Sequence, residues 1–361
     1  MGEHMKFVPI AWVAAGIATA GAATPPPVDV SAAYSDGNGG LVMHFPGPVQ
    51  CENAGDPEVV ELARPMNVLG PNGADQREPV TMIFAIDENG RTISIAPDQE
   101  ANRFHTDDFS AALAASRFAS SSPRTNCRIS YTAKFAPFAD APLAELVSYD
   151  ITANNQSLPR NAWQRIYGQG NCMEAPIVEP LSVAHPDLDK IPGKRGSRDW
   201  TMASFDIEAD GRTRNVRVVA GTGNAALDTA TIEAVARSRY RGRLPRHGCS
   251  IPYWRNADIL PAPSTFSDLP STSDAACEYV RWDREPVLHY PMEFERRLIE
   301  GWAIVRYSYA PWGEISDVEV VDAQPSSVFG DAAKAMLMRA KRSRSEFGAS
   351  GCYQRVDYRM G

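Results

Sequence analysis

The sequence predicts an α+β fold made of three tandem copies of one small unit. Each unit is a small antiparallel sheet (β-β-α-β) packed with one helix and stapled by one disulfide. Three observations predict it: a segment that alternates apolar and polar residues around a turn glycine occurs three times, an alanine-rich segment follows each occurrence, and a pair of cysteines brackets each set. One amphipathic helix laid on a small antiparallel sheet buries the apolar faces of both.

Three stretches predict β-hairpins because apolar and polar residues alternate on both sides of a turn. The stretches are residues 82–95, 205–219 and 303–320. Period-two alternation is typical of a half-buried strand. The turns contain Asn89-Gly90, Asp210-Gly211 and Trp312-Gly313. Glycine adopts the positive φ that a tight turn requires, so each stretch predicts the first two strands of a unit.

An amphipathic helix is predicted after each hairpin. The clearest apolar stripe has the spacing i, i+4, i+7, i+8 and i+11 and consists of Phe329, Ala333, Met336, Leu337 and Ala340. Shorter stripes fall within residues 109–116 and 227–235. A short strand that begins with a cysteine is predicted after each helix, at Cys127, Cys249 and Cys352.

The six cysteines keep the same register in all three units. Taken in order, they form pairs separated by 76, 77 and 75 residues: Cys51 with Cys127, Cys172 with Cys249, and Cys277 with Cys352. A proline follows each first cysteine by 14 residues (Pro65, Pro186 and Pro291), and the turn glycine follows it by 39, 39 and 36 residues. Six cysteines permit 15 pairings, and the register favours this one.

The cysteine spacing predicts disulfides and not a metal site. An exported chain meets an oxidising compartment, where disulfides are the expected state. Closing loops of this length contributes roughly 4–5 kcal/mol in the chain-entropy model. The sequence has no C-x-x-C, no H-E-x-x-H and no paired Cys/His spacing of the kind that binds zinc. We expect no metal and no cofactor.

The N-terminus predicts export. From Met5 the chain has one lysine, a short apolar run and then small residues, and both Ala18-Thr19-Ala20 and Ala20-Gly21-Ala22 fit a signal-peptidase site. The apolar run is shorter than the roughly 20 residues of a spanning helix, so a cleaved signal is favoured over an uncleaved inner-membrane anchor. The predicted divisions are a signal peptide at residues 1–22 and units at 23–145, 146–262 and 263–361.

The charge of the chain argues against nucleic acid as the main partner, because the net charge is −8 and the pI is near 5.4. Basic residues nevertheless gather at the ends of the second and third predicted helices: Arg237, Arg239, Arg241, Arg243 and Arg246, and then Arg339, Lys341, Arg342 and Arg344. Cations near a helix C-terminus complement its dipole. Capping on a solvated face is the simpler interpretation, and a docking patch for an acidic partner is the alternative.

Several short motifs occur together in the third unit: Tyr290-Pro291, Glu300-Gly301, the turn Gly313, a valine-rich strand at 318–321 and a helix that begins with residues 329–333. This set resembles the C-terminal domain of the TonB family of energy transducers. The second unit matches at His185-Pro186, Leu227-Asp228 and Ser238-Arg239-Tyr240, and the first at Arg64-Pro65, Asn89-Gly90 and Ser116-Arg117-Phe118. The resemblance covers most of residues 50–361.

The resemblance implies a periplasmic protein of the cell envelope, related to TonB-dependent transport, that binds envelope proteins such as TonB-dependent outer-membrane receptors. Transducers of the family have a membrane helix and a long proline-rich arm, whereas this sequence has a predicted cleavable signal and only Pro25-Pro26-Pro27 as a proline tract. A cysteine pair in each unit is not general in the family. We therefore expect divergent, exported recognition domains, in contact with a membrane only if the N-terminal segment stays uncleaved.

No residue pattern predicts an enzyme. The sequence has no G-x-S-x-G nucleophile elbow. Residues 221–226 fit the dinucleotide pattern G-x-G-x-x-A, but that pattern requires a parallel βαβ unit and here follows a hairpin strand. Asp107-Asp108 is interpreted as a helix start, where negative charge is favoured. An exported enzyme with an unrecognised site is the alternative.

The last strand of the third unit is the predicted docking edge. Small sheets have exposed edges, and an extended peptide can add a strand there through main-chain hydrogen bonds. Pro252 removes a donor from the corresponding strand of the second unit. The predicted partner-binding edge is Tyr353, Gln354, Arg355, Val356, Asp357 and Tyr358. The alternatives are pairing of this edge within the chain or in a homodimer, and a structural scaffold without a peptide ligand.

Overall fold

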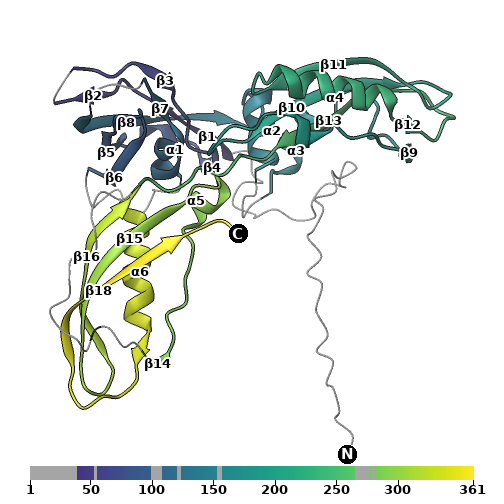
Figure 1. Cartoon of the computed structure of the whole chain (residues 1–361). Coiled ribbons are helices and arrows are strands. Elements are labelled where there is room, and N and C mark those ends of the chain that lie inside the picture. The colour runs from purple at the N-terminus through teal and green to yellow at the C-terminus, as the bar shows by residue number, and fades with distance from the viewer. Residues whose placement is uncertain are drawn as a thin grey trace, which may run out of the picture.

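The computed structural model describes residues 39–52, 55–98, 108–119, 123–152, 157–264, 277 and 281–361. The predicted signal peptide lies outside these residues. The chain is α+β with small antiparallel sheets and few helices, as predicted. Three groups of elements each combine a hairpin, a helix and a last strand that pairs with the first strand of the hairpin. We call them the first, second and third modules (Figure 1).

The first module has the largest sheet. Its elements are β5 (Val80–Ile86), β6 (Thr92–Pro97), α1 (Phe109–Ala115) and β8 (Arg124–Pro137). Every second residue of β5 is buried, which is the pattern expected from its sequence. The sheet is wider than predicted, with the order β4-β1-β8-β5-β6, because β1 (Gly39–Pro46), β2 (Gln50–Cys51) and β4 (Val68–Pro71) extend it beyond β8. A short 3₁₀ helix, Ala74–Gln76, follows β4.

The second and third modules have three-stranded sheets with one helix each. The second consists of β10 (Asp199–Ile207), β11 (Thr213–Gly221), α4 (Ala225–Arg237) and β13 (Arg246–Arg255), in the order β11-β10-β13. The third consists of β15 (Gly301–Tyr309), β16 (Ile315–Gln324), α6 (Ser327–Arg339) and β18 (Ala349–Tyr358), in the order β16-β15-β18. The predicted stripe of α6 is buried, so its periodicity correctly located the packed face.

Each module also has a two-stranded ribbon that the sequence analysis did not predict. The pairs are β3 (Val59–Glu61) with β7 (Arg117–Phe118), β9 (Pro180–Ser182) with β12 (Arg239–Tyr240), and β14 (Trp282–Arg284) with β17 (Lys341–Arg342). Two further short helices are the 3₁₀ helix Leu188–Lys190 and α5 (Met292–Arg296). These strands have two or three residues, which is too short for a periodic signal.

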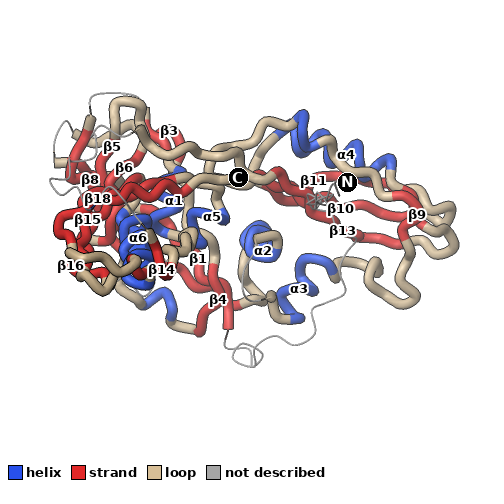
Figure 2. The backbone as a smooth tube through the Cα atoms, turned by 60° about the horizontal axis from the view of Figure 1, so that its bottom comes forward, coloured by secondary structure: helices blue, strands red, loops and turns tan. Residues whose placement is uncertain are grey.

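Two helices join the first and second modules. They are α2 (Leu143–Asp150) and α3 (Arg160–Tyr167), and Figure 2 shows them beside β1 and the second sheet. Leu146 and Trp163 of these helices belong to one buried cluster with Leu41 of β1 and Met202 of β10. Burial of such side chains supplies roughly 25 cal/mol per Å² of apolar surface, so this cluster holds the two modules together.

The first and third modules share one hydrophobic core. Ile95 and Phe109 of the first module belong to the same buried cluster as Phe294 and Phe329 of the third. The backbones also meet, since the Ile95 amide donates to the Pro325 carbonyl over 2.9 Å. The modules are therefore packed units of one body, with the second and third extending in different directions from the first (Figure 1).

One buried ion pair lies where all three modules meet. Arg297, which follows α5, binds Asp108 at 2.5 Å, and both side chains are less than a tenth exposed. The same guanidinium donates to the carbonyl of Gly196 at 3.2 Å and to that of Arg64 at 2.7 Å. Asp108 also accepts from the Met66 amide at 2.6 Å. Asp108 does begin α1, as predicted, but its carboxylate binds Arg297 and makes no capping bond to the helix.

The three disulfides are Cys51–Cys127, Cys172–Cys249 and Cys277–Cys352. These are the pairs that the cysteine register predicts, and each bond lies within one module. Every first cysteine precedes the hairpin of its module, and every second cysteine lies in the last strand. Each bond therefore closes the module around its sheet and helix.

Arg297→Ala should lower the free energy of unfolding by about 3–5 kcal/mol, because it leaves the Asp108 carboxylate buried without its partner. Urea denaturation followed by circular dichroism measures this. The double variant Asp108→Asn/Arg297→Met, which removes both charges, should recover part of the loss. Arg296→Ala is the matched control, because within the described residues this neighbouring arginine makes only an exposed contact with Met292. It should change stability by less than about 0.5 kcal/mol. Equal losses for Arg297→Ala and Arg296→Ala would contradict the role of the ion pair.

Cys51→Ser should leave Cys127 as the one free thiol and keep the other four cysteines oxidised, because the disulfides are independent. Loss of the cross-link should cost about 2–4 kcal/mol. Non-reducing peptide mapping and thiol titration measure the pairing. A peptide that joins Cys127 to Cys172 would show that the bonds exchange between modules.

Candidate functional site

The turn glycine of every hairpin makes the same close backbone contact. Gly90, Gly211 and Gly313 all have positive φ, at 74°, 82° and 91°. A Cβ atom at these positions would lie 2.0, 1.9 and 1.9 Å from the carbonyl oxygens of Phe118, Tyr240 and Arg342 respectively. The amides of those same residues donate to the glycine carbonyls over 2.8–3.0 Å. The turn is thus pinned to the short strand that follows the helix, and only glycine fits there.

The residues around that short strand repeat their hydrogen bonds in the first two modules. Ser116 Oγ donates to the Ala112 carbonyl and accepts from the Ala63 amide, and Ser238 Oγ does the same with Ala234 and Ala184. The arginines that follow these serines, Arg117 and Arg239, donate to the last carbonyls of their helices. These contacts satisfy helix ends that would otherwise lack partners. The Ser-Arg-aromatic motif therefore has a structural role in both modules.

The third module replaces the aromatic residue of this motif with Arg342. In the first and second modules, Phe118 and Tyr240 stack on Phe84 and Phe205. Arg342 instead donates to the Tyr307 hydroxyl at 2.8 Å and lies 4.4 Å from the centre of the Tyr309 ring. Burial raises the pKa of Tyr307, and Arg342 opposes that rise. Tyr307 occupies the strand position of Phe84 and Phe205. A hydrogen bond to Tyr307 and a cation–π contact with Tyr309 thus replace the aromatic stack in the third module.

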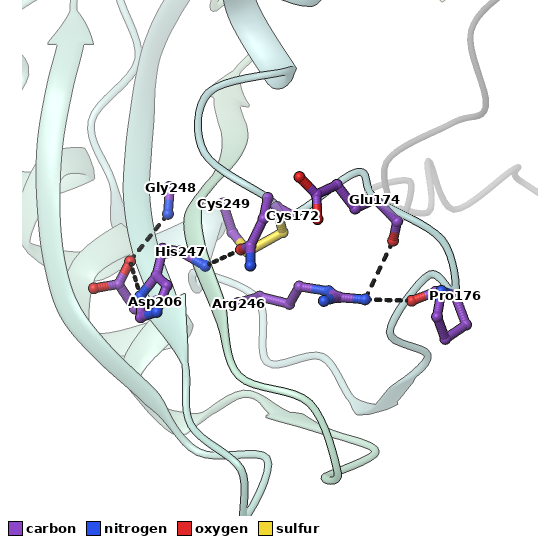
Figure 3. The surroundings of a disulfide bond; sticks show 9 residues. Cys172, Glu174, Pro176, Asp206, Arg246, His247, Gly248 and Cys249 are labelled. Carbon is purple, nitrogen blue, oxygen red and sulfur yellow. Dashed lines mark hydrogen bonds and ion pairs between the residues drawn. A yellow bond between two sulfur atoms is a disulfide. The ribbon is translucent and has the colours of Figure 1, made fainter.

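The segment after the first cysteine accepts hydrogen bonds from an arginine in two modules, and in the second module this arginine is buried. Arg246 is 5% exposed and donates to the carbonyls of Glu174 and Pro176 at 3.2 and 2.6 Å (Figure 3). Arg124 of the first module similarly donates to the Gly55 carbonyl. Arg246 and Arg342 were predicted to lie in solvated basic patches. That prediction is wrong for both, because both side chains are buried. Arg246 binds the carbonyls of a loop, and Arg342 contacts tyrosine rings.

The disulfide lies at the start of the last strand. In the first module Cys51 pairs directly opposite Cys127, on the side of β8 away from β5. In the second module the Asn171 amide, next to Cys172, donates to the His247 carbonyl at 3.1 Å. The cysteine segment therefore covers the beginning of the strand edge, and any open edge lies beyond the second cysteine.

The last strands differ in what covers the rest of the edge. In the first module β1 pairs with β8 from Gly40↔Pro137 to Pro46↔Tyr131. In the second module Pro252 interrupts the row of donors on β13. In the third module no described residue pairs with the free side of β18. Among the described residues, β18 is therefore the one last strand whose outer edge is uncovered and whose row of amides is complete. Tyr353–Tyr358 lie on this strand.

The side chains of β18 alternate between the core and the surface. Cys352, Val356 and Tyr358 are buried, and the Tyr358 hydroxyl donates to the Phe329 carbonyl on α6 at 3.1 Å. Burial raises the pKa of Tyr358. On the other face Arg355 binds Asp357 at 2.9 Å and lies 5.2 Å from the Trp302 ring. The packed face fixes the strand, so that its outer backbone edge is held in an extended conformation.

The described residues form neither a metal site nor a dinucleotide site. No group of three His, Cys, Asp or Glu side chains among them could hold a metal ion. Residues 221–226 connect an antiparallel hairpin strand to α4, and Asn224 caps that helix through the Leu227 amide. The G-x-G-x-x-A pattern therefore marks a helix cap and not the parallel unit that a dinucleotide requires.

Residues 193–254 match the family described as the C-terminal region of the Gram-negative bacterial TonB protein. These residues include β10, β11, α4 and most of β13. This part of the chain is a TonB C-terminal-like domain. The match covers the second module alone, although the sequence motifs are most numerous in the third. No curated protein matches the chain significantly.

The TonB C-terminal family is non-enzymatic and is associated with the periplasm and cell envelope, and its domains interact with envelope proteins such as outer-membrane receptors. The match therefore supports a TonB-related role in protein interaction. Among the residues that the structure describes, no helix has the length and apolar character needed to cross a bilayer.

Gly211→Ala should destabilise the TonB-like domain more than Gly223→Ala, although both glycines have a φ of 82°. A Cβ atom added at Gly223 would meet no other atom within 4 Å, whereas one added at Gly211 would lie 1.9 Å from the Tyr240 carbonyl oxygen. We expect about 1–2 kcal/mol for Gly223→Ala from backbone strain alone, and at least about 2 kcal/mol more for Gly211→Ala. Urea titration of both variants tests this, and equal losses would show that the close contact is unimportant.

Proposed function

We propose that the three modules are copies of one TonB-like unit, and that the protein is a periplasmic protein-binding module. In this proposal the third module binds an extended segment of an envelope protein, such as an outer-membrane receptor, by strand addition at the edge of β18. The observation that supports it most directly is that β18 keeps an open, proline-free edge among the described residues, while β8 is covered and β13 is interrupted.

The first module contains an internal example of the same interaction. Strand β1 comes from outside the β-β-α-β module and lies antiparallel on the outer edge of β8 over seven residue pairs. Main-chain hydrogen bonds to a sheet edge need no particular side chains, so the same edge can accept a strand from another protein. This supports strand addition as the binding mode, because the fold already uses it within one chain.

Proline in the second module indicates which amide of β18 faces outward. Pro252 pairs with Met202 of β10, and Arg355 occupies the same position in β18, opposite Ile304 of β15. Proline lacks an N–H, so at an edge strand its nitrogen faces the side without a partner. The Arg355 amide therefore faces the open edge and is the first donor we assign to an incoming strand.

A second candidate function is that of a structural scaffold. The shared core of the first and third modules and the cluster around α2 and α3 favour it, because extensive packing between modules is what a rigid support needs. A homodimer that pairs β18 with its own copy is a further possibility for the open edge. The three functions differ in what contacts the open edge of β18: an envelope protein in the main proposal, a second copy of the chain in a homodimer, and no partner strand in a scaffold.

Arg355→Pro tests the docking edge. It copies the sequence of the second module, so it should leave the fold intact while it removes one outward donor. Arg355→Ala is the matched control, because it removes the same side chain and the exposed pair with Asp357 but keeps the amide. A photo-crosslinking residue at position 353 reports what lies on the edge in cells.

We expect crosslinked adducts with an envelope protein in the parent and in Arg355→Ala, and a loss of roughly tenfold or more in Arg355→Pro, which corresponds to about 1.4 kcal/mol. Circular dichroism controls for folding. Adducts of two copies of this chain would assign the edge to a homodimer, and the absence of adducts in every version would favour the scaffold. Equal adduct yields for Arg355→Ala and Arg355→Pro would contradict docking at this edge.

A further inference from the structure

Three arginines come together where the first and second modules meet. Arg91 follows the turn Gly90 and forms an antiparallel bridge with Arg117 of β7. Arg195 lies in the segment that leads into β10 and bridges to Asp258, three residues before Pro261. The Pro261 carbonyl in turn accepts a hydrogen bond from Arg91 Nη2 at 2.6 Å. Segments from three separate parts of the chain thus meet at one place.

The guanidinium groups of this cluster have donors to spare. Arg117 uses only Nη1, which donates to the carbonyls of Ala114 and Ser116 at 3.0 and 2.6 Å. Each guanidinium carries five N–H donors. Within the described part of the chain, none of Arg91, Arg117 and Arg195 forms an ion pair with a carboxylate. The cluster therefore offers unused donors and uncompensated charge.

Positive charge exceeds negative charge around Arg117. Burial, Arg91 and Arg195 together lower the pKa of Arg117 to about 10, against the opposite effect of Asp87 and Glu61. One oxygen of Asp87 is already bound by the amides of the hairpin turn, and Glu61 binds Lys194 at 3.4 Å. Lys194 also lies 3.9 Å from Asp199. Four cations thus face three carboxylates in a half-buried place.

In the second module an ion pair with a carboxylate neutralises the arginine that corresponds to Arg91. Among the described residues of the first module, Arg91 has no such ion pair. Arg212 follows Gly211 as Arg91 follows Gly90, and it binds Asp210 at 3.3 Å. Asn89 stands two residues before Arg91, where the second module has Asp210. The first module therefore lacks the carboxylate that neutralises this arginine, and it gains Arg195 as an additional neighbour.

We propose that Arg91, Arg117 and Arg195 form a binding site for a phosphate-type oxyanion at the junction of the first and second modules. A phosphate monoester carries about −1.5 to −2 charges and three acceptor oxygens at neutral pH, which matches the excess of positive charge and the unused donors. Guanidinium groups bind such oxyanions through paired hydrogen bonds. The ligand is either free phosphate or a phosphate on a lipid headgroup, since both present the same chemistry.

Thermal unfolding of the full chain in phosphate, against chloride at equal ionic strength, tests the site. Phosphate stabilises many proteins without binding a site, so the comparison is between variants. Arg195→Gln removes an exposed side chain of the cluster that forms no ion pair within the described residues. Arg243→Gln is the matched control, because Arg243 is an exposed arginine between β12 and β13 that forms no ion pair within the described residues.

Phosphate should raise the Tm of the parent and of Arg243→Gln by at least about 2 °C more than it raises the Tm of Arg195→Gln. The general effect of phosphate is the same in all three proteins, so the extra rise measures anion bound at the site. Equal gains in all three proteins would overturn the proposal. Vesicles of phosphatidylcholine with or without phosphatidic acid distinguish the sources. Binding to the phosphatidic acid vesicles that is lost in Arg195→Gln assigns a lipid phosphate, and a phosphate effect without vesicle binding assigns a free anion.

Discussion

The buried pair between Asp108 and Arg297 is the interaction on which the arrangement of the three modules depends. Arg297 also binds the carbonyl of Arg64, between β3 and β4, and that of Gly196, before β10, so one guanidinium connects all three modules. A buried charge is stable only when its hydrogen bonds are satisfied. The contacts around Arg297 can therefore form together only in one arrangement, and that arrangement also brings the first and third modules into one core.

All three modules share the backbone contact between the turn glycine and the short strand that follows the helix, and they differ in the side chains around it. Each turn glycine lies against the carbonyl of the following short strand, which sets the length of the hairpin relative to the helix. The first two modules surround this contact with a serine, an arginine and an aromatic stack, whereas the third uses Arg342 over Tyr309. The backbone contact is the same in all three modules because no side chain fits there, and the surrounding residues differ around it.

The edges of the three sheets differ more than their interiors. A strand of the same chain covers β8, a proline interrupts β13, and β18 keeps a continuous row of amides among the described residues. Exposed edges invite unwanted pairing, so the open edge of β18, in a chain that covers or interrupts two others, is the feature from which we propose binding. The modules also differ at Arg91, which lacks the ion pair with a carboxylate that Arg212 forms at the corresponding position.

The local features could be predicted from the amino-acid sequence: the hairpins, the stripe of α6, the turn glycines and the cysteine pairs. These follow from periodicity and spacing, which depend on neighbouring residues. Only the tertiary structure decided that β1 covers β8, that α2 and α3 bridge two modules, and that Arg246 and Arg342 are buried. Such features join residues far apart in the chain, and a side chain such as Arg297 finds its partner 189 residues away. No local pattern specifies that distance, because the partner is chosen by how the modules pack.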